Sequence, residues 1–178
     1  MIETLISSKT RIKLLFKFFL NTKTKAYLRS LETEFGESSN AIRVELNRLE
    51  EAGMLSSEIQ GNKKFFQANV GHPLFHEIHN IVKKHLGFDT IIDQVISNLG
   101  EVNEVYVIGS LARGIDSPII DLLLVGDVKK EYLTHLIEKS EQMISRKIRY
   151  IVYDRNDFEK LGKDTFEVQP LLIWKNEQ

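Results

Sequence analysis

The stretch that most constrains the fold of this chain runs from Val105 to Gly126. It begins with a short β-branched apolar run, residues 105–108, and ends with a second, residues 119–125, which carries a single acid, Asp121. Apolar runs this short, bounded by turn residues, predict buried strands. Between them stand a Gly-Ser turn, a Leu-Ala-Arg segment and a Gly/Asp/Ser/Pro break. The pattern predicts strand, turn, short helix, loop and strand.

The segment Gly109-Ser-Leu-Ala-Arg-Gly114, followed by the strand with Asp121, resembles the signature of the polymerase-β-like nucleotidyltransferase superfamily. The resemblance implies a minimal nucleotidyltransferase domain with a small mixed sheet flanked by helices. It implies that Gly109 and Ser110, helped by Arg113, bind nucleotide phosphate, and that Asp121 binds a metal ion. Mg²⁺ and a nucleoside triphosphate are the cofactors of such a reaction, which transfers a nucleoside monophosphate.

The acids that this chemistry requires are incomplete. Two carboxylates at i and i+2 of one strand point to the same face, and the signature has them as Ser-Asp-x-Asp. Here Ile119 stands two residues before Asp121, and Pro118 stands at the serine position. Magnesium requires oxygen ligands, which isoleucine lacks. The best match to the strand of the third acid, residues 147–153, contains no acid. We therefore expect a catalytically impaired domain.

Each residue of this motif also has a purely structural interpretation. Gly109 and Ser110 can serve as a tight strand-to-helix connection kept for the fold, an interpretation as well supported as a phosphate site. Asp116 lies in a Gly/Pro loop, and a turn is favoured over a metal ligand there. The structural alternative for Arg113 is a surface ion pair, with Asp116 as the expected partner.

The first 70 residues show a different pattern. Apolar residues at helical spacing predict a helix over residues 8–20, a second over 25–35 and a third over 40–52, which Ser38 or Ser39 caps. Residues 54–60 and 63–69, joined by Gly61-Asn62, predict a β-hairpin. Helix, helix, turn, helix and hairpin is the order of a winged helix-turn-helix. Residues 8–70 resemble ArsR-like transcription regulators, with Leu-x-x-Leu-Glu-x-Ala-Gly-x-Leu leading into the wing.

This resemblance implies binding to double-stranded DNA. The third helix would lie in the major groove, with Asn40, Arg43 and Asn47 on the side opposite its apolar stripe. Phosphate contacts are expected from residues at the helix end and the hairpin tip, namely Arg48, Lys63 and Lys64, and Arg29 is a further candidate. The alternative is an ordinary solvated surface, which we consider less well supported because a wing follows the helix.

Composition restricts where such a surface can lie and which chemistry is available. The net charge of -1 means that no basic field covers the whole chain, so a DNA-binding surface must be local. The absence of cysteine excludes disulfides, zinc–thiolate sites and thiol catalysis. The longest apolar segment, residues 12–20, is interrupted by lysines and is too short to cross a bilayer. With no signal-peptide pattern, we expect a cytoplasmic protein without membrane contact.

Residues 72–86 predict a helix that links the two patterns. His72, His76 and His79 raise a metal hypothesis, which we disfavour because neither cysteine nor a suitably placed acid accompanies them. A segment that reaches a partner subunit fits better, and we expect a homodimer. The predicted organisation is α/β (α+β): residues 1–70 a winged helix, 71–86 a linker helix, and 87–178 a nucleotidyltransferase-like domain.

Hypotheses of different classes remain open from the sequence. The first is a DNA-binding regulator whose impaired C-terminal domain binds a nucleotide or a protein partner. The second is an active nucleotidyltransferase that depends on Asp121 and Mg²⁺. A third and weaker hypothesis is an antitoxin-like partner of a toxin, for which no residue argues.

Overall fold

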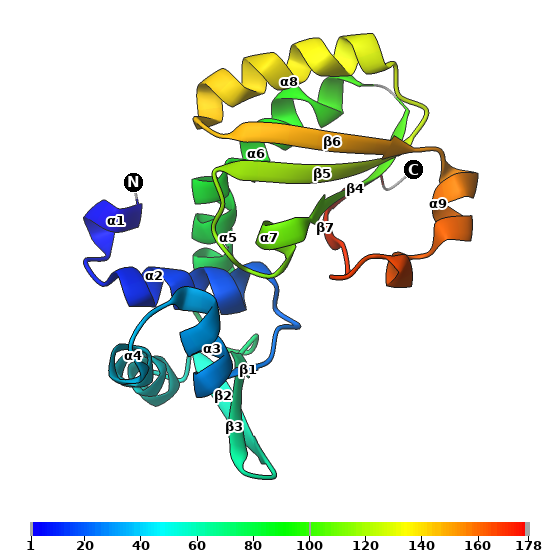
Figure 1. Ribbon diagram of the computed structural model, residues 1–178. Helices are drawn as coiled ribbons and strands as arrows, with labels where there is room; N and C mark the ends of the chain where they lie inside the picture. The colour runs from blue at the N-terminus through cyan, green and yellow to red at the C-terminus, as the bar shows by residue number, and fades with distance from the viewer. Residues whose placement is uncertain (1, 100, 177–178) are drawn as a thin grey trace. The chain divides into compact units, whose positions relative to one another are not determined.

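The computed structural model describes residues 2–99 and 101–176. The chain divides into two compact units, Met1–His85 and Leu86–Gln178 (Figure 1). Both combine helices with a sheet, so the fold is mixed α/β. No helix in the described ranges is long and apolar enough to cross a membrane.

The first unit is a set of helices with a small sheet. The sheet has the order β1-β3-β2, with both pairs antiparallel. Its elements, in chain order, are α1 (Ile2–Leu5), α2 (Lys9–Leu15), the π-helix η1 (Phe16–Leu20), β1 (Ala26–Tyr27), α3 (Leu28–Phe35), α4 (Ser39–Glu51), β2 (Leu55–Gln60), β3 (Lys63–Ala68) and α5 (Phe75–Leu86).

The core of this unit is built around the continuous helix α2–η1. The sequence predicts one apolar stripe with Lys17 outside it, but every side chain from Leu14 to Leu20 is buried. The π-helical turn and the elements packed around it leave no side open to solvent. Lys17 is 7% exposed, and its Nζ lies 2.7 Å from Oε2 of Glu34 on α3. A buried ammonium requires such a partner.

Helix α4 begins where the sequence predicts. The Oγ of Ser38 accepts a hydrogen bond from the backbone N–H of Ala41, as an N-cap residue does. One side of the helix is buried, through Ile42, Glu45, Leu46 and Leu49. The hairpin β2–β3 follows, and Gly61 at its tip has φ +62°, the conformation that a two-residue turn with glycine first requires.

Helix α5, expected as a linker, packs on η1 of the first unit. The rings of Phe75 and Phe19 lie 5.7 Å apart between centroids, and the ring of His85 stacks on Phe16 at 5.4 Å. Nδ1 of His79 lies 2.5 Å from the carbonyl oxygen of Phe19. The histidines of α5 therefore pack and hydrogen-bond, and the described residues contain no cluster of three metal-ligating side chains.

The second unit is a four-stranded sheet with helices. The strand order is β6-β5-β4-β7; β5 and β6 are parallel, and the other pairs are antiparallel. Its elements are α6 (Phe88–Gln94), the 3₁₀ turn η2 (Ile96–Asn98), β4 (Val102–Ile108), α7 (Gly109–Ala112), β5 (Ile119–Gly126), α8 (Lys130–Ile144), β6 (Lys147–Tyr153), α9 (Arg155–Leu161), η3 (Lys163–Thr165) and β7 (Leu171–Lys175).

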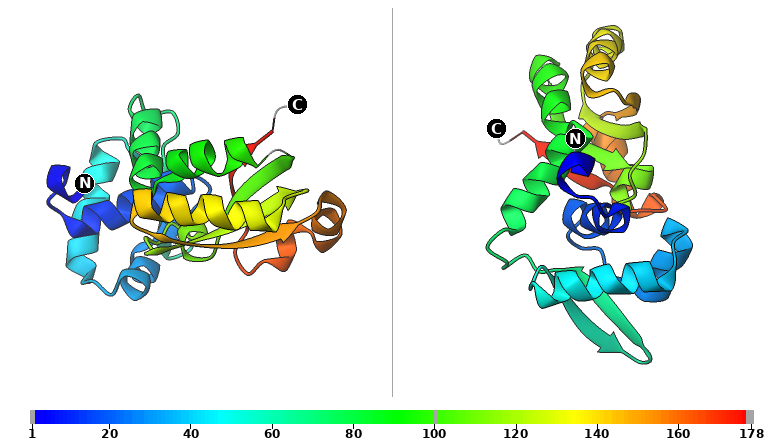
Figure 2. Two further views of the ribbon diagram at one scale, coloured as in Figure 1. Left: turned by 90° about the horizontal axis from the view of Figure 1, so that it is seen from above. Right: turned by 90° about the vertical axis from the view of Figure 1, so that its left-hand side faces the viewer.

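The parallel pair explains the long helix between its strands. Parallel neighbours need a crossover connection, and α8 supplies it between β5 and β6. Helices α6 and α8 lie side by side on one face of the sheet (Figure 2). On the other face Leu123 and Val125 pack with Tyr106 and Phe158. Alternation along β5 places Asp121 on this second face as well.

Candidate functional site

The first candidate site surrounds Asp121 on β5. The parallel register places Arg149 of β6 directly beside it. Nε of Arg149 lies 2.6 Å from Oδ1 of Asp121, and Nη2 lies 3.0 Å from Oδ2. This is a bidentate, charge-assisted pair, and it raises the pKa of Arg149 further above its usual value. Both carboxylate oxygens of the expected metal ligand thus accept hydrogen bonds from a guanidinium.

The Gly-Ser turn lies against Asp121. Gly109 has φ +68°, and a Cβ built on it would lie 3.0 Å from Oδ2 of Asp121. A larger residue would be strained and would press on the carboxylate. Ser110 is exposed, and α7 has only four residues. The turn brings the backbone close to Asp121.

Arg113 and Asp116 do not pair with each other, so the expected partnership is wrong. Nη2 of Arg113 lies 3.2 Å from Oε2 of Glu167, and Oδ1 of Asp116 lies 2.7 Å from Nη1 of Arg146. Arg146 follows α8 and also donates to the carbonyl of Ser117. It therefore fixes the loop that contains Asp116, which agrees with the structural interpretation of that acid as part of a turn.

The residues around Asp121 do not fit a two-magnesium site. Ile119 shares the face of Asp121 and offers no oxygen, and its neighbour across the parallel pair is Lys147. In the part of the chain that the structure describes, no group of three acids or histidines gathers anywhere. A cation of the protein itself, Arg149, compensates the charge of the lone carboxylate.

The second candidate site is the outer side of α4 with the neighbouring groove. Asn40, Arg43 and Asn47 are exposed along this helix. A groove of about 550 Å³ lies between α3, α4 and β3, and its lining includes three of the basic residues, Arg29, Arg43 and Lys63. Arg43 and Arg29 have no ion-pair partner within residues 2–99 and 101–176, and Nζ of Lys63 lies 4.5 Å from the ring centroid of Tyr27.

The remaining two predicted contacts are engaged within the protein. Nζ of Lys64 lies 2.6 Å from Oε2 of Glu50, and hydrogen bonds from Lys64 and Ser57 lower the pKa of Glu50. Nη1 of Arg48 lies 3.4 Å from Oε1 of Glu45, an acid that Arg11 also binds. The open candidates are therefore Arg29, Asn40, Arg43, Asn47 and Lys63.

Two ion pairs at the candidate sites were not predicted from the sequence. Arg149 was not singled out, because its role depends on a register between strands that a whole helix separates. The pairing of Glu50 with Lys64 was also not predicted, because 14 residues separate the two along the chain. The available signal for this second pair was the alternation of polar residues along the hairpin. Side chains on one face of the hairpin can contact the helix that packs against it.

Comparisons with known proteins give a limited result. No family model matches the chain, and no curated protein matches it. A solved structure of a candidate nucleotidyltransferase from Sulfolobus solfataricus is 29% identical, covering 57% of this chain and 88% of its own, with a TM-score of 0.36. The AF1382 protein from Archaeoglobus fulgidus is 15% identical, covering 55% of this chain and 98% of its own, with a TM-score of 0.37. These likenesses establish neither a family nor an activity.

Proposed function

We propose that this chain is a DNA-binding transcription regulator. In this proposal the first unit is a winged helix-turn-helix that places α4 in the major groove. The second unit has a nucleotidyltransferase-like fold without metal-dependent transfer activity. The protein binds two DNA half-sites as a homodimer, which is the usual arrangement for such modules.

The observation that carries the proposal is the outer side of α4. Asn40, Arg43 and Asn47 are exposed at i, i+3 and i+7, and their side chains are of the types that read adenine and guanine edges. Arg43 is not neutralised by any carboxylate of the described chain. Arg43 is exposed on its helix and lies beside a basic groove. An arginine in this position can bind an anion from outside the protein.

The order of elements supports the same proposal. Helices α2–η1, α3 and α4 precede the hairpin β2–β3, and β1 completes a three-stranded sheet. The α3–α4 connection is short, with Gly36 at φ +64°. This is the order of a winged helix-turn-helix, in which the hairpin is the wing that meets the DNA backbone.

The distribution of charge favours the first unit as the DNA-binding part. Residues 1–85 contain 13 Lys and Arg against 9 Asp and Glu, a formal charge of +4. Residues 86–178 contain 11 against 16, a formal charge of -5. The overall charge of -1 therefore hides a basic unit joined to an acidic one, and asymmetry of this kind is typical of nucleic-acid binding.

For the second unit, the pair Asp121–Arg149 favours a non-catalytic role. A magnesium ion at Asp121 would have to displace a bidentate guanidinium and would find isoleucine at the next position on that face. The active nucleotidyltransferase is therefore the weaker candidate. Nucleotide binding at Gly109, Ser110 and Arg113 stays a prediction, as do the cytoplasmic location and the antitoxin-like pairing.

Arg43→Ala tests the DNA-binding proposal, with Arg48→Ala as the matched control. Both arginines are exposed on α4, but Arg48 is engaged by Glu45. We expect Arg43→Ala to weaken binding to selected operator DNA about tenfold or more, since a good base contact contributes about 1–3 kcal/mol. Arg48→Ala should have a smaller effect. Operators can be obtained by selecting bound duplexes from a random pool and measured by fluorescence anisotropy.

Two outcomes would overturn the two halves of the proposal separately. If the selection recovers no sequence, or if both variants bind like the wild type, α4 is not a reading helix. If the protein with Mg²⁺ and labelled ATP labels an acceptor, and Asp121→Ala abolishes the label, the second unit is an active transferase.

A further inference from the structure

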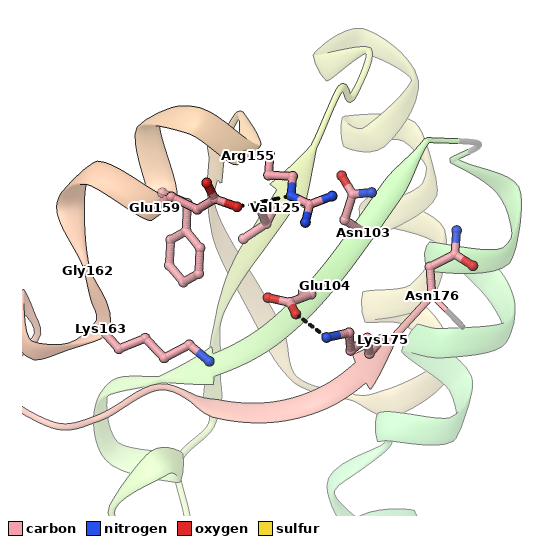
Figure 3. A pocket seen from close by; sticks show the side chains of 10 residues that line it. Asn103, Glu104, Val125, Arg155, Glu159, Gly162, Lys163, Lys175 and Asn176 are labelled. Carbon is pink, nitrogen blue, oxygen red and sulfur yellow. Dashed lines mark hydrogen bonds and ion pairs between the residues drawn. The ribbon is translucent and has the colours of Figure 1, made fainter. Parts of the chain in front are cut away.

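A cavity of about 410 Å³ opens in the second unit, away from Asp121 (Figure 3). Val125, which lines it, lies four residues further along β5 on the same face as Asp121, roughly 13 Å away at about 3.3 Å per residue. The cavity lies at the carboxyl end of the parallel strands β5 and β6. Open α/β sheets commonly bind ligands at this end. None of Gly109, Ser110 or Asp121 lines it.

The cavity has an apolar floor. Phe158 of α9 is 6% exposed and Val125 is 2% exposed, and both line the cavity. The ring of Phe158 packs on the buried ring of Tyr106, with centroids 5.5 Å apart. The floor is thus a fixed part of the core cluster on this face of the sheet, and it can bind the apolar part of a ligand without rearrangement.

Three basic side chains stand around this floor and come from different segments. Arg155 comes from α9, Lys163 from η3 and Lys175 from β7; in Figure 3 Lys163 and Lys175 extend into the cavity from opposite sides, and Arg155 lies against Glu159. The two acids of the lining are already engaged. Nζ of Lys175 lies 3.1 Å from Oε1 of Glu104, and Nε of Arg155 lies 3.1 Å from Oε1 of Glu159.

Glu104 is already bound by two neighbouring side chains, Tyr106 and Lys175. Its partial burial acts to raise its pKa, but hydrogen bonds from the hydroxyl of Tyr106 and from Lys175 outweigh burial and lower the pKa below the usual range. The charge of Lys163 also acts to lower this pKa, and its Nζ lies over the ring of Tyr106, 4.8 Å from the centroid. No carboxylate of residues 2–99 or 101–176 is hydrogen-bonded to this ammonium. The rim therefore carries three positive charges and two negative charges, and both carboxylates are already paired with a cation.

We propose that this cavity binds a small organic anion. Its carboxylate or phosphate contacts Lys163 between Arg155 and Lys175, and its apolar ring or chain lies on Phe158 and Val125. The volume falls within the range of small-molecule sites, roughly 300–1,000 Å³, and suits one such molecule. The site is separate from the Gly-Ser motif.

Titration of the full-length, ¹⁵N-labelled protein tests this inference. The probes are phenyl phosphate, benzoate and inorganic phosphate, and the readout is the chemical shift of each backbone amide. We expect saturable shifts at Glu104, Lys163 and Lys175 with at least one aromatic anion, and weaker binding of inorganic phosphate, which has no apolar part. Comparing phenyl phosphate with benzoate identifies the preferred head group.

Charge reversal provides the decisive comparison. Lys163→Glu should weaken binding of the better probe at least about tenfold, because attraction to a neighbouring ammonium becomes repulsion. Lys160→Glu is the matched control: Lys160 is exposed on α9, outside the cavity lining, and should leave binding unchanged. The inference is wrong if neither aromatic anion binds at these amides, if both reversals act equally, or if inorganic phosphate binds as tightly as phenyl phosphate.

Discussion

Replacing Glu50 by glutamine should make the protein bind DNA more tightly and more salt-dependently. Glu50 holds Lys64, which lies on β3 of the hairpin and lines the groove beside Arg43. In the wild type, Lys64 must leave a carboxylate at 2.6 Å before it can contact a phosphate. Glutamine keeps the shape of the side chain and its capacity to bond Ser57, but it removes the charge that retains the lysine.

The size of the effect follows from one additional phosphate contact. Each contact contributes about 0.9 to the slope of log K against log salt concentration on duplex DNA. Glu50→Gln should therefore steepen the slope by up to about 0.9, so that affinity falls about 3.5-fold more than in the wild type between roughly 50 and 200 mM salt. Lys63→Ala should change the slope by a similar amount in the opposite direction.

A mixed-sequence duplex suffices for the measurement, because counterion release does not depend on sequence. Anisotropy titrations at four or more salt concentrations give the slopes of the wild type, Glu50→Gln and the control Glu51→Gln. Glu51 is an exposed neighbour that binds no lysine in the described structure, so its variant loses the same charge without freeing a cation. Equal slopes for the two variants, or a shallower slope for Glu50→Gln, would refute the reasoning.

The same ion pair predicts a pH dependence. The pKa of Glu50 is lowered, so its stabilising contribution is complete above the usual carboxyl range and is lost as pH falls through the lowered pKa. Protonation there releases Lys64 as the glutamine does. At acid pH, the wild type and Glu50→Gln should therefore have the same salt slope. A difference in slope that persists at low pH would contradict this prediction.

Three further predictions concern the two units. The double variant Ile119→Asp/Arg149→Ala should bind Mn²⁺ or Mg²⁺ in calorimetry more tightly than Ile119→Asp alone, because Arg149 no longer occupies the neighbouring carboxylate. Gly126→Ala should destabilise by at least about 3 kcal/mol in urea unfolding, since its Cβ would lie 2.3 Å from the backbone oxygen of Glu101. Glu34→Ala should destabilise the protein, because it removes the carboxylate that lies 2.7 Å from the buried ammonium of Lys17, and adding Lys17→Met should restore most of the lost stability in the same unfolding measurement.

The local features of the fold were predictable because short segments of sequence determine them. The cap at Ser38, the periodicity of α4, the Gly61 turn and the apolar strands β4 and β5 all depend on neighbours within a few residues. Such elements appear where the patterns place them. The short β1 was missed, because two residues give no periodicity.

Features that depend on distant segments were not predictable. The pairing of Arg149 with Asp121 depends on two strands aligned across helix α8, and no local pattern gives that register. The burial of Lys17 depends on a π-helical turn and on an acid from α3. The cavity beside Lys163 is formed by several segments of the second unit, so the sequence shows its residues only as scattered charges.

The guanidinium at Asp121 also determines how the second unit responds to its ionic surroundings. An enzyme that gathers several carboxylates at one point depends on dissolved divalent ions to relieve their repulsion. Here the neutralising charge is covalently part of the neighbouring strand. Chelators should therefore not change the stability of this part of the sheet. The melting temperature of the protein should be the same in EDTA as in millimolar magnesium.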